Sequence, residues 1–389
     1  MDWTTMFEQE WIMGLLNEMS LLSIVLLLLF YLAFLIQFVV YTRLYIPILK
    51  LGKSSVGSYE LPPVSVIICA KNESVNLAKH IPLLMEQDYP DFEVVVVDDG
   101  SWDGSIGELM KWASLYPNFR HTRTLHEGDK RDLRGKKFAL TIGIKAARHE
   151  HLVFTDADCY PQDKHWLINM AQGFQDAQMV LGYGGYETKN SFVNTLIRFE
   201  TFKIAKRYFA LAKVGMAYMG VGRNMAYTKS SFFEIFGFRS HMHIQSGDDD
   251  LFIQDFSKNK SVAICPRTSG STLSVPKEHL SSWFKQKRRH ISTSGHYRKD
   301  IKWMLGILEG SSLLFFLGFV TLPILKVPLV YWLPIVILQL LIQYIFYYRF
   351  SKQLKEGKLW LFHPVLEVFT WLFQAVVTLS VWIKKPNHW

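Results

Sequence analysis

The chain has 389 residues, of which 49% are hydrophobic and 15% aromatic, and its formal net charge at pH 7 is +9. A soluble chain of this length would form two or three domains. The apolar residues are instead concentrated in long runs near both ends and leave a hydrophilic middle. This distribution excludes an ordinary cytosolic enzyme, a disordered chain and a small disulfide scaffold. The three cysteines show no metal-ligand spacing and cannot all pair, so we expect reduced, mostly buried thiols in a cytosolic compartment.

The first apolar run covers residues 21–42, which is long enough for a helix that crosses a bilayer. Residues 1–20 carry four acids and no Lys or Arg, whereas Arg43, Lys50 and Lys53 follow the run. The run is too long, and its N-terminal flank too acidic, for a cleaved signal peptide. Because basic residues favour the cytosolic side of a membrane helix, we predict a short extracytoplasmic N-terminus and a cytosolic middle.

Three further apolar segments, residues 303–325, 327–348 and 359–383, occupy the C-terminal third. The basic stretch 349–358 predicts a cytosolic loop after the second segment, so that the first two segments form a hairpin. The third is predicted to be a transmembrane or re-entrant helix, because two lysines follow it directly. We therefore expect a multi-pass protein of the cell (inner) membrane, with the lipid bilayer as a partner.

Two of these segments contain an acid, Glu309 and Glu367. A charge inside the bilayer is costly, so such acids are functional candidates. They are either paired or protonated residues near helix ends, or residues that line a groove or pore between the helices.

The hydrophilic middle alternates short apolar runs with helical patterns. The predicted strands are residues 64–69, 93–97 and 151–155, and the predicted helices are residues 74–87, 103–115 and 136–148. Continuous apolar strands alternating with helices indicate an α/β fold with a parallel sheet covered on both faces. Ligands of such sheets bind at the carboxyl ends of the strands.

Acidic side chains follow two of these strands, Asp98 and Asp99 after one and Asp156 and Asp158 after another. Four carboxylates in one pocket repel each other unless a cation lies among them, so we predict a divalent metal, Mg²⁺ or Mn²⁺. The first strand is not followed by G-x-G-x-x-G, and the chain has no Walker sequence. We therefore expect a metal and basic side chains, rather than a glycine-rich loop, to hold any phosphates.

Each acidic motif also has a structural interpretation. Asp156-Ala-Asp158 resembles many surface turns, and the Asp98-Asp99-Gly-Ser sequence is typical of a strand-to-helix turn in which Ser101 or Asp103 caps the next helix. The three acids Asp248–Asp250 precede a helical pattern, where they would favour the helix dipole. Because the motifs occur together, we favour ligand binding for the first two and a general base for the third.

A basic segment, residues 281–302, directly precedes an apolar segment. It is either an interfacial helix attracted to anionic lipid or a segment from which Gln286 and Arg289 reach over the pocket to a diphosphate. A nucleic-acid partner is not expected, because the basic residues adjoin the membrane and no nucleic-acid module is visible. The aromatic face that begins at Phe192 is attributed to core packing, with contact to the membrane surface as the alternative.

Taken in order, these motifs resemble the family-2 glycosyltransferases, membrane-bound enzymes with a Rossmann-like GT-A catalytic domain. The resemblance covers roughly residues 60–300. The matching segments are VSVIICAKNE (64–73), QDYP (87–90), DDGSWDGS (98–105), GKK (135–137), FTDAD (154–158), GRNMA (222–226), SGDDDL (246–251) and QKRRH (286–290). The resemblance implies a catalytic domain over residues 60–280 and places the QxxRH motif in the basic segment.

The resemblance also implies residue roles. Ala70, Glu73 and Asp99 would contact the base and ribose of a uridine-type nucleotide, with assistance from Asp98 and with Lys136 near the nucleotide. Asp158 would bind the metal, Asp156 the donor sugar or ribose, and Gln286 and Arg289 the diphosphate or the acceptor. The base would be Asp249, with Asp248 as the alternative. His290 replaces the usual Trp, so that the acceptor-stacking wall is smaller or is supplied by Trp283.

The function implied is inverting transfer of a sugar from a nucleotide-diphosphate sugar, such as a UDP-sugar, to a membrane-associated polysaccharide or glycan acceptor. The alternative within this class is a non-processive transferase that acts on a lipid acceptor. From a different class, the chain would be an inactive nucleotide-binding membrane subunit or a transporter component. The retained acids argue against this last hypothesis.

Overall fold

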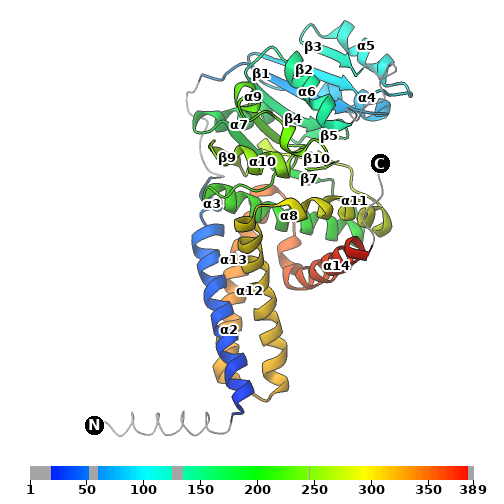
Figure 1. Ribbon diagram of the computed structural model, residues 1–389. Helices are drawn as coiled ribbons and strands as arrows, with labels where there is room; N and C mark the ends of the chain where they lie inside the picture. The colour runs from blue at the N-terminus through cyan, green and yellow to red at the C-terminus, as the bar shows by residue number, and fades with distance from the viewer. Residues whose placement is uncertain (1–18, 52–59, 125–134, 245, 384–389) are drawn as a thin grey trace. The chain divides into compact units, whose positions relative to one another are not determined.

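The computed structural model describes residues 19–51, 60–124, 135–244 and 246–383 (Figure 1). The predicted extracytoplasmic segment therefore lies almost entirely outside the described residues. Contacts divide the chain into two compact units, one of Met1–Ile46 with Lys299–Phe346, the other of Pro47–Arg298 with Tyr347–Trp389. Each unit is considered separately.

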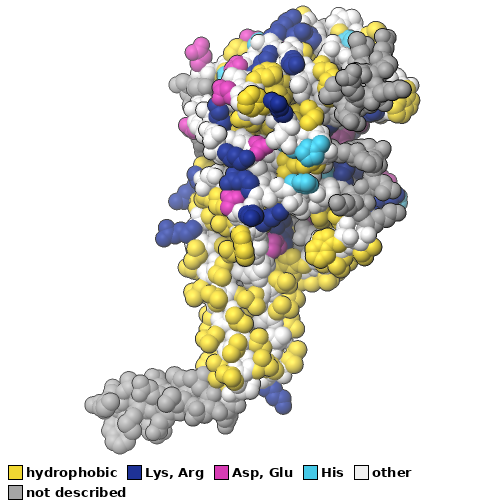
Figure 2. All heavy atoms as spheres, in the orientation of Figure 1, with side chains coloured by type: hydrophobic (Ala, Val, Ile, Leu, Met, Phe, Trp, Pro, Cys, Tyr) yellow, Lys and Arg dark blue, Asp and Glu magenta, His cyan; other side chains and the backbone are white. Residues whose placement is uncertain are grey.

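The first unit consists of apolar helices. They are α2 (Leu21–Val39), a π-helical turn (Val40–Tyr45), α12 (Lys299–Ile324) and the part of α13 (Leu329–Leu354) up to Phe346. Helix α2 packs along α12, where Phe30 stacks on Phe315 with ring centroids 4.7 Å apart. Gly318 permits this approach, because a Cβ there would lie 2.6 Å from the Phe30 ring. Hydrophobic side chains cover most of the visible surface of these helices (Figure 2).

A polar contact also joins these helices. The Gln37 amide of α2 donates to Ser311 Oγ (2.6 Å) and to the Leu308 carbonyl (3.3 Å) of α12. Between α12 and α13 the chain reverses at Lys326, whose φ is +57°. This turn is the tip of the hairpin that the sequence predicts.

Four described helices are long and apolar enough to cross a membrane: Leu21–Leu51, Lys299–Ile324, Leu329–Leu354 and Leu359–Ile383. They coincide in position with the four predicted apolar segments and fit an association with a membrane. The bounds differ because regular helix continues into charged residues, to Lys299 at the start of α12 and to Leu354 at the end of α13. The apolar run alone does not mark the end of a helix.

The second unit is built on a seven-stranded sheet in the order β3-β2-β1-β4-β8-β6-β9. Its strands are β1 (Val64–Ala70), β2 (Phe92–Asp98), β3 (Phe119–Arg123), β4 (His151–Asp156), β6 (Met179–Gly182), β8 (Met225–Thr228) and β9 (Val262–Cys265). A small second sheet has the order β5-β10-β7, with β5 (Cys159–Pro161), β7 (Gly184–Tyr186) and β10 (Thr272–Ser274). The three predicted strands pair in parallel, as expected, whereas β8, which was not among them, runs antiparallel to both β4 and β6.

Helices complete the second unit. They are α3 (Ile48–Leu51), α4 (Ser74–Met85), α5 (Ser105–Leu115), α6 (Lys136–Ala146), α7 (Trp166–Ala171), α8 (Phe192–Lys213), α9 (Lys229–Glu234), α10 (Asp250–Phe256), α11 (Leu280–Thr293) and α14 (His363–Ile383). Short 3-10 turns occur at Gln172–Gln175, Arg239–His241, Thr268–Gly270, Ser294–His296 and Leu359–Phe362. Helix α14 packs against both α8 and α11.

Alternation along the strands places the sheet between two layers of helices. Val66 and Val94 belong to the core formed with Leu77 of α4 and Leu109 of α5. Ile67, on the opposite face, approaches Gly143 of α6, where a Cβ would lie 2.7 Å from its Cγ2. The strands are therefore buried on both faces, which is why their sequences are continuously apolar.

The strand register sets the position of the polar loops. Ala70 of β1 pairs with Asp98 of β2, and Cys69 pairs with Asp156 of β4. All three strands thus end at the same edge of the sheet, and the loops that follow them start side by side.

Candidate active site

The loops after β1 and β2 are hydrogen-bonded to each other. The backbone N–H of Asn72 donates to Ser101 Oγ (2.8 Å) and that of Glu73 donates to Ser105 Oγ (3.0 Å). In return the N–H of Trp102 donates to Asn72 Oδ1 (3.0 Å). Asn72 adopts a left-handed conformation (φ +58°), which asparagine tolerates better than most residues. The two loops consequently form one structural unit.

Ala70 and Glu73 lie at the end of β1, on the side of this paired loop. Ala70 is buried, and the Glu73 carboxylate accepts from Asn76 Nδ2 at 2.6 Å. Burial raises the pKa of Glu73, although this hydrogen bond opposes the shift. Asp103 accepts from the N–H groups of Ser105 (3.0 Å) and of Ser74 (3.1 Å), the first residues of α5 and α4. Asp103 therefore binds the first N–H of α5, although the N-cap residue of that helix is Gly104.

The two acids that end β2 have different surroundings. Asp98 is completely buried, with Arg123 Nε at 3.1 Å from its carboxylate. Asp99 accepts from Thr124 Oγ1 (3.0 Å) and lies 3.8 Å from Lys71 Nζ. Asp98 thus supports the turn from inside, while Asp99 lies at the edge where the loops meet. Arg123 and Thr124 belong to β3 and the residue after it, a strand that the sequence pattern did not reveal.

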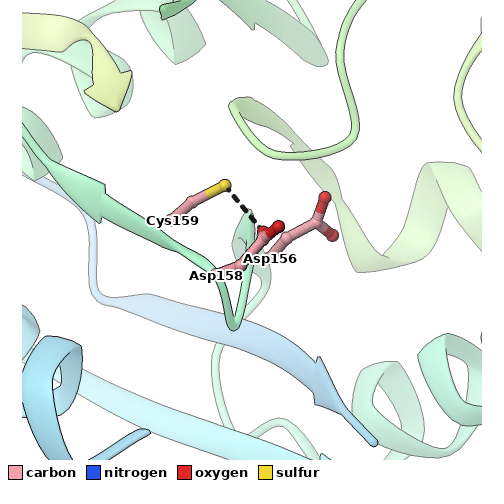
Figure 3. A group of neighbouring side chains, drawn as sticks. All are labelled: Asp156, Asp158 and Cys159. Carbon is pink, nitrogen blue, oxygen red and sulfur yellow. Dashed lines mark hydrogen bonds between the residues drawn. The ribbon is translucent and has the colours of Figure 1, made fainter. Parts of the chain in front are cut away.

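Asp156 ends β4, Asp158 lies in the turn that follows, and Cys159 begins β5 (Figure 3). One ligand atom from each of the three lies within 4.8 Å of the other two. The Cys159 thiol contacts Asp158 Oδ1 (3.2 Å) and Ser274 Oγ (2.8 Å), and burial raises its pKa well above the usual value. The thiol therefore stays protonated. The donors left for a cation are carboxylate oxygens, which suit Mg²⁺ or Mn²⁺ better than a soft metal.

A histidine supports the turn between these two acids. His80 of α4 is 2% exposed, and its Nδ1 lies 3.0 Å from the Ala157 carbonyl. A carbonyl only accepts, so Nδ1 carries the proton and donates it. Burial lowers the pKa of His80, which keeps the ring neutral, and the ring packs on Tyr160. This contact is not visible in the sequence, because an isolated histidine in a helix forms no recognisable motif.

Lys136, the first residue of α6, connects two acidic motifs. Its Nζ lies 2.7 Å from Asp156 and 3.2 Å from Asp248. Burial alone would lower the pKa of Lys136, but these carboxylates raise it well above the usual value. The lysine, both acids, Gly222 and Tyr227 line one small cavity. Lys136 thus places a fixed positive charge where the end of β4 meets the Asp248–Asp250 segment.

The three consecutive acids Asp248–Asp250 are used in three different ways. Although burial opposes ionisation, Lys136 lowers the pKa of Asp248. Asp250 is buried and accepts from Thr293 Oγ1 (2.6 Å) and from the Tyr297 hydroxyl (2.7 Å).

Within the described residues, the hydrogen bonds found for the Asp249 carboxylate come only from backbone groups. The donors are the N–H of Gly222 (3.2 Å) and the N–H of Asp250 (2.8 Å). Burial and the neighbouring charges of Asp248 and Asp250 raise the pKa of Asp249 to about 7. A carboxylate with this pKa accepts a proton readily near neutral pH.

The segment before these acids is held by Lys137. Its Nζ donates to the carbonyls of His241 (2.7 Å), Ile244 (2.8 Å) and Ser246 (2.8 Å). All three protons of the ammonium are used, and burial lowers the pKa of Lys137 to about 8. Lys136 and Lys137 therefore differ completely in role. The sequence did not reveal this, because adjacent residues of a helix point about 100° apart and only the fold decides which one turns inward.

The GRNMA segment contributes support rather than ligands. The buried Asn224 amide donates to the carbonyls of Tyr183 and Gly270, each at 2.8 Å, and its Oδ1 accepts from Trp166 Nε1 at 2.9 Å. A side chain at Gly182 would collide with this amide, since a Cβ there would lie 2.4 Å from it. Asn224 thus fixes the strands beneath the site.

Helix α11 brings Gln286, Arg289 and His290. Burial lowers the pKa of Arg289, while the charges of Asp248 and Asp156 oppose the shift. Gln286 precedes Arg289 by three residues, so both lie on the same face of the helix. His290 is exposed.

Trp283 does not take the place of the missing tryptophan. It is 2% exposed and stacks on Phe373 of α14, with ring centroids 4.0 Å apart and planes 5° apart. The expectation that Trp283 supplies an acceptor-stacking wall is therefore wrong. A ring that packs one helix on another has no free face for a sugar.

Comparison with known proteins relates part of the chain to a family. Residues 65–236 match the sequence model of glycosyl transferase family 2. The chain is 36% identical over 109 residues to the glycosyltransferase AglE of Haloferax volcanii, a match that covers 28% of this chain and 34% of that protein. It is 28% identical over 100 residues to a poly-beta-1,6-N-acetyl-D-glucosamine synthase of Staphylococcus epidermidis, covering 26% and 23%. The matched segments thus span about a third or less of these two relatives.

A solved structure resembles more of the chain. The mannosyltransferase PcManGT of Pyrobaculum calidifontis, in complex with GDP-Man and Mn²⁺, superimposes with a TM-score of 0.52 at 18% identity over 92% of this chain and 99% of that one. At this identity the likeness shows the fold alone. The α/β GT-A fold expected from the resemblance is confirmed. The chain therefore contains a glycosyl transferase family 2 domain over residues 65–236, and its four apolar helices fit association with a membrane.

Proposed function

We propose that this protein is an inverting glycosyltransferase that moves a sugar from a nucleotide-diphosphate sugar, with UDP as its nucleotide, to a membrane-associated polysaccharide or glycan. The observation that carries the proposal is the meeting of acidic motifs from separate parts of the chain at one edge of the sheet. Lys136 contacts Asp156 of one motif and Asp248 of another. A site with clustered carboxylates and basic side chains suits a metal-bound diphosphate.

The donor occupies the edge where β1, β2 and β4 end. Ala70, Glu73 and Asp99 contact the base and ribose, and the buried Asp98 keeps the turn in place. Lys136 lies near the nucleotide. The pairing of the loops after β1 and β2 supports this assignment, because a preformed loop pair binds a flat base without first having to be ordered.

The metal is Mg²⁺ or Mn²⁺, held by Asp158 with Asp156 beside the donor sugar or ribose. When bound, the ion offsets the negative charge that grows on the leaving diphosphate. The donor set supports the assignment, since it consists of two carboxylates beside a protonated thiol. Mn²⁺ is the ion of the Pyrobaculum calidifontis complex.

The reaction is a single displacement. Asp249 takes the proton of the acceptor hydroxyl, and the oxygen attacks the anomeric carbon from the face opposite the diphosphate. The bond from that carbon to the diphosphate oxygen breaks as the new bond forms, so the configuration inverts. Arg289, with Gln286 beside it, neutralises the leaving group or orients the acceptor, and His290 lies next to them. The raised pKa of Asp249 and the pairing of Asp248 with Lys136 favour Asp249 as the base.

The second candidate is transfer of one sugar to a lipid acceptor. It is favoured by the burial of Trp283 and by His290 in the place of the family's Trp, since neither supplies a large free ring for a growing glycan chain. In both cases the protein lies in the cell (inner) membrane with its catalytic domain on the cytosolic side. The basic residues that follow residues 21–42 and 327–348 support this orientation.

The test is an assay of the purified full chain with a panel of nucleotide sugars, with and without Mn²⁺ and EDTA. We expect one donor to be hydrolysed or transferred in a metal-dependent reaction, and the anomeric configuration to be inverted by NMR. Product length then separates a polymer from a single addition to lipid. Hydrolysis of no donor would indicate an inactive subunit and would overturn the proposal.

Variants locate the reaction. Asp158→Ala and Asp249→Asn should each lower the rate by at least about a hundredfold, while Asp176→Ala, an exposed acid away from these motifs, should leave the rate unchanged. Wild-type rates in Asp158→Ala or Asp249→Asn would refute the assigned roles. The thermal unfolding temperature of each variant should be measured to exclude misfolding.

A further inference from the structure

Helix α14 has its polar residues turned toward the protein and its apolar residues turned outward. The outward stripe, hereafter the apolar stripe, follows a regular spacing of three and four residues and lies on one side of the helix. Its members are all 40% or more exposed: Phe362 61%, Val365 58%, Phe369 43%, Leu372 61%, Val376 57%, Leu379 54% and Ile383 86%. Figure 2 shows hydrophobic side chains on the visible part of α14. This arrangement is the reverse of a helix on the surface of a water-soluble domain.

The inward face contains His363, Glu367 and Thr370, all of which are buried. Glu367 forms an ion pair with Lys203 of α8 (3.3 Å), a lysine whose side chain is only 2% exposed. The Lys203 ammonium also lies 5.2 Å from the ring centroid of Trp371. Glu367 is thus a paired acid, which was one of the two interpretations left open from the sequence.

Contacts with the catalytic domain continue along the whole helix. Trp283 of α11 stacks on Phe373 (4.0 Å), and Arg288 of α11 donates to the Ser380 carbonyl (3.3 Å). From Glu367 to Ser380 the helix advances about 20 Å. Helix α8 contacts α14 between Glu367 and Trp371, and α11 contacts it at Phe373 and Ser380. A membrane-spanning α14 would therefore draw α11 into the hydrocarbon. Helix α11 has the sequence LSSWFKQKRRHIST, with four Lys and Arg residues, and such a helix is excluded from the bilayer core.

The charges that flank α14 agree with this. Lys352, Lys355 and Lys358 precede the helix, and Lys384 and Lys385 follow it. Basic residues favour one side of the membrane, so clusters at both ends place both ends on that side. They also attract the helix to anionic headgroups.

We propose that α14 is not a fourth membrane crossing but lies in the plane of the membrane interface, with the apolar stripe in the lipid and the catalytic domain on its inner face. The partner of the stripe is the lipid bilayer. The chain then crosses the membrane three times, through α2, α12 and α13, and its C-terminus is on the same side as the catalytic domain. This proposal concerns topology and holds for any donor and acceptor.

The first experiment locates the C-terminus. Single cysteines are introduced by Lys111→Cys on the catalytic domain, Lys326→Cys at the turn between α12 and α13, and Asn387→Cys. The full chain is then labelled in sealed, oriented vesicles with a membrane-impermeant maleimide, with the wild type as the blank for its three native thiols. We expect positions 111 and 387 to be labelled from one side and position 326 from the other. Labelling of position 387 together with position 326 would show a fourth crossing and overturn the proposal.

The second experiment measures depth. Spin labels on Val365→Cys, Leu372→Cys and Leu379→Cys are compared in vesicles of phosphatidylcholine and phosphatidylglycerol. These positions lie about 10 Å apart along the helix. A helix in the interface gives three similar, shallow depths. If the helix crosses the membrane or is re-entrant, the label at position 372 is several ångströms deeper than the other two. If the labels are shielded from lipid, a second protein covers the stripe. Either result would refute the proposal.

Discussion

Removing the Lys137 ammonium should slow transfer without unfolding the domain. In Lys137→Met the three carbonyls of the segment before Asp248–Asp250 lose their common donor. The bond to the His241 carbonyl is buried, whereas the other two bonds are only partly buried, so we expect water to replace the lost donor at those two carbonyls. The net loss is therefore close to that of one hydrogen bond to a charged group, about 2 kcal/mol. This corresponds to a roughly thirtyfold smaller population of the correctly positioned segment.

The loss should appear mainly in kcat, with little change in the donor KM, because the segment positions Asp249 rather than the nucleotide. The matched control is Lys229→Met, which removes a lysine that donates to the Ala147 (2.7 Å) and Lys145 (3.3 Å) carbonyls. Initial rates and thermal unfolding of both variants are compared with the wild type. A rate within twofold of wild type for Lys137→Met, or an equal loss in the two variants, would refute the positioning role.

Three further results are expected. His80→Leu leaves the Ala157 carbonyl without its donor and should raise the Mn²⁺ concentration for half-maximal activity about tenfold. His80→Asn, whose amide replaces Nδ1–H, should return this concentration to the wild-type value in the same titration. Because burial and acidic neighbours raise the pKa of Asp249 to about 7, and a base acts only when ionised, kcat/KM should fall tenfold per pH unit below about pH 7; a flat profile from pH 5 to 8 would contradict this. Glu356→Ala leaves buried Arg198 without its partner (2.8 Å) and should lower the free energy of unfolding by about 3–5 kcal/mol, measured by denaturant titration.

The sequence predicted the central strands of the fold to within a residue or two. The predicted strands 64–69 and 151–155 correspond to the observed strands Val64–Ala70 and His151–Asp156. Strands that are buried on both faces have continuous β-branched sequences, which can be recognised without knowledge of the fold. The strand Phe119–Arg123 was missed, since its sequence FRHTR is mostly polar and it lies at the edge of the sheet. The direction of β8 was also missed, because burial has the same signature in parallel and antiparallel strands.

At the site too, some features could be predicted from the sequence and others could not. The meeting of Asp98, Asp99 and Asp156 at one edge followed from their positions after parallel strands, and the register places them there. The contacts of His80 and Lys137 were not predictable, because they depend on which side of a helix faces a loop that is distant in the chain. Residue types show which groups can react, and tertiary packing decides which groups hold them.

Asp250 links two parts of the protein that the motifs treat as separate. It directly follows Asp249, yet its carboxylate is bound by Thr293 at the end of α11 and by Tyr297 just beyond. Helix α11 also packs on α14 through Trp283. The position of the proposed base is consequently connected to α11 and α14, and α14 is the helix for which we propose contact with lipid. If α14 lies in the membrane interface, its position there affects the position of Asp249 through α11 and Asp250. Lipids that shift α14 would then change the rate of transfer without contacting the substrate.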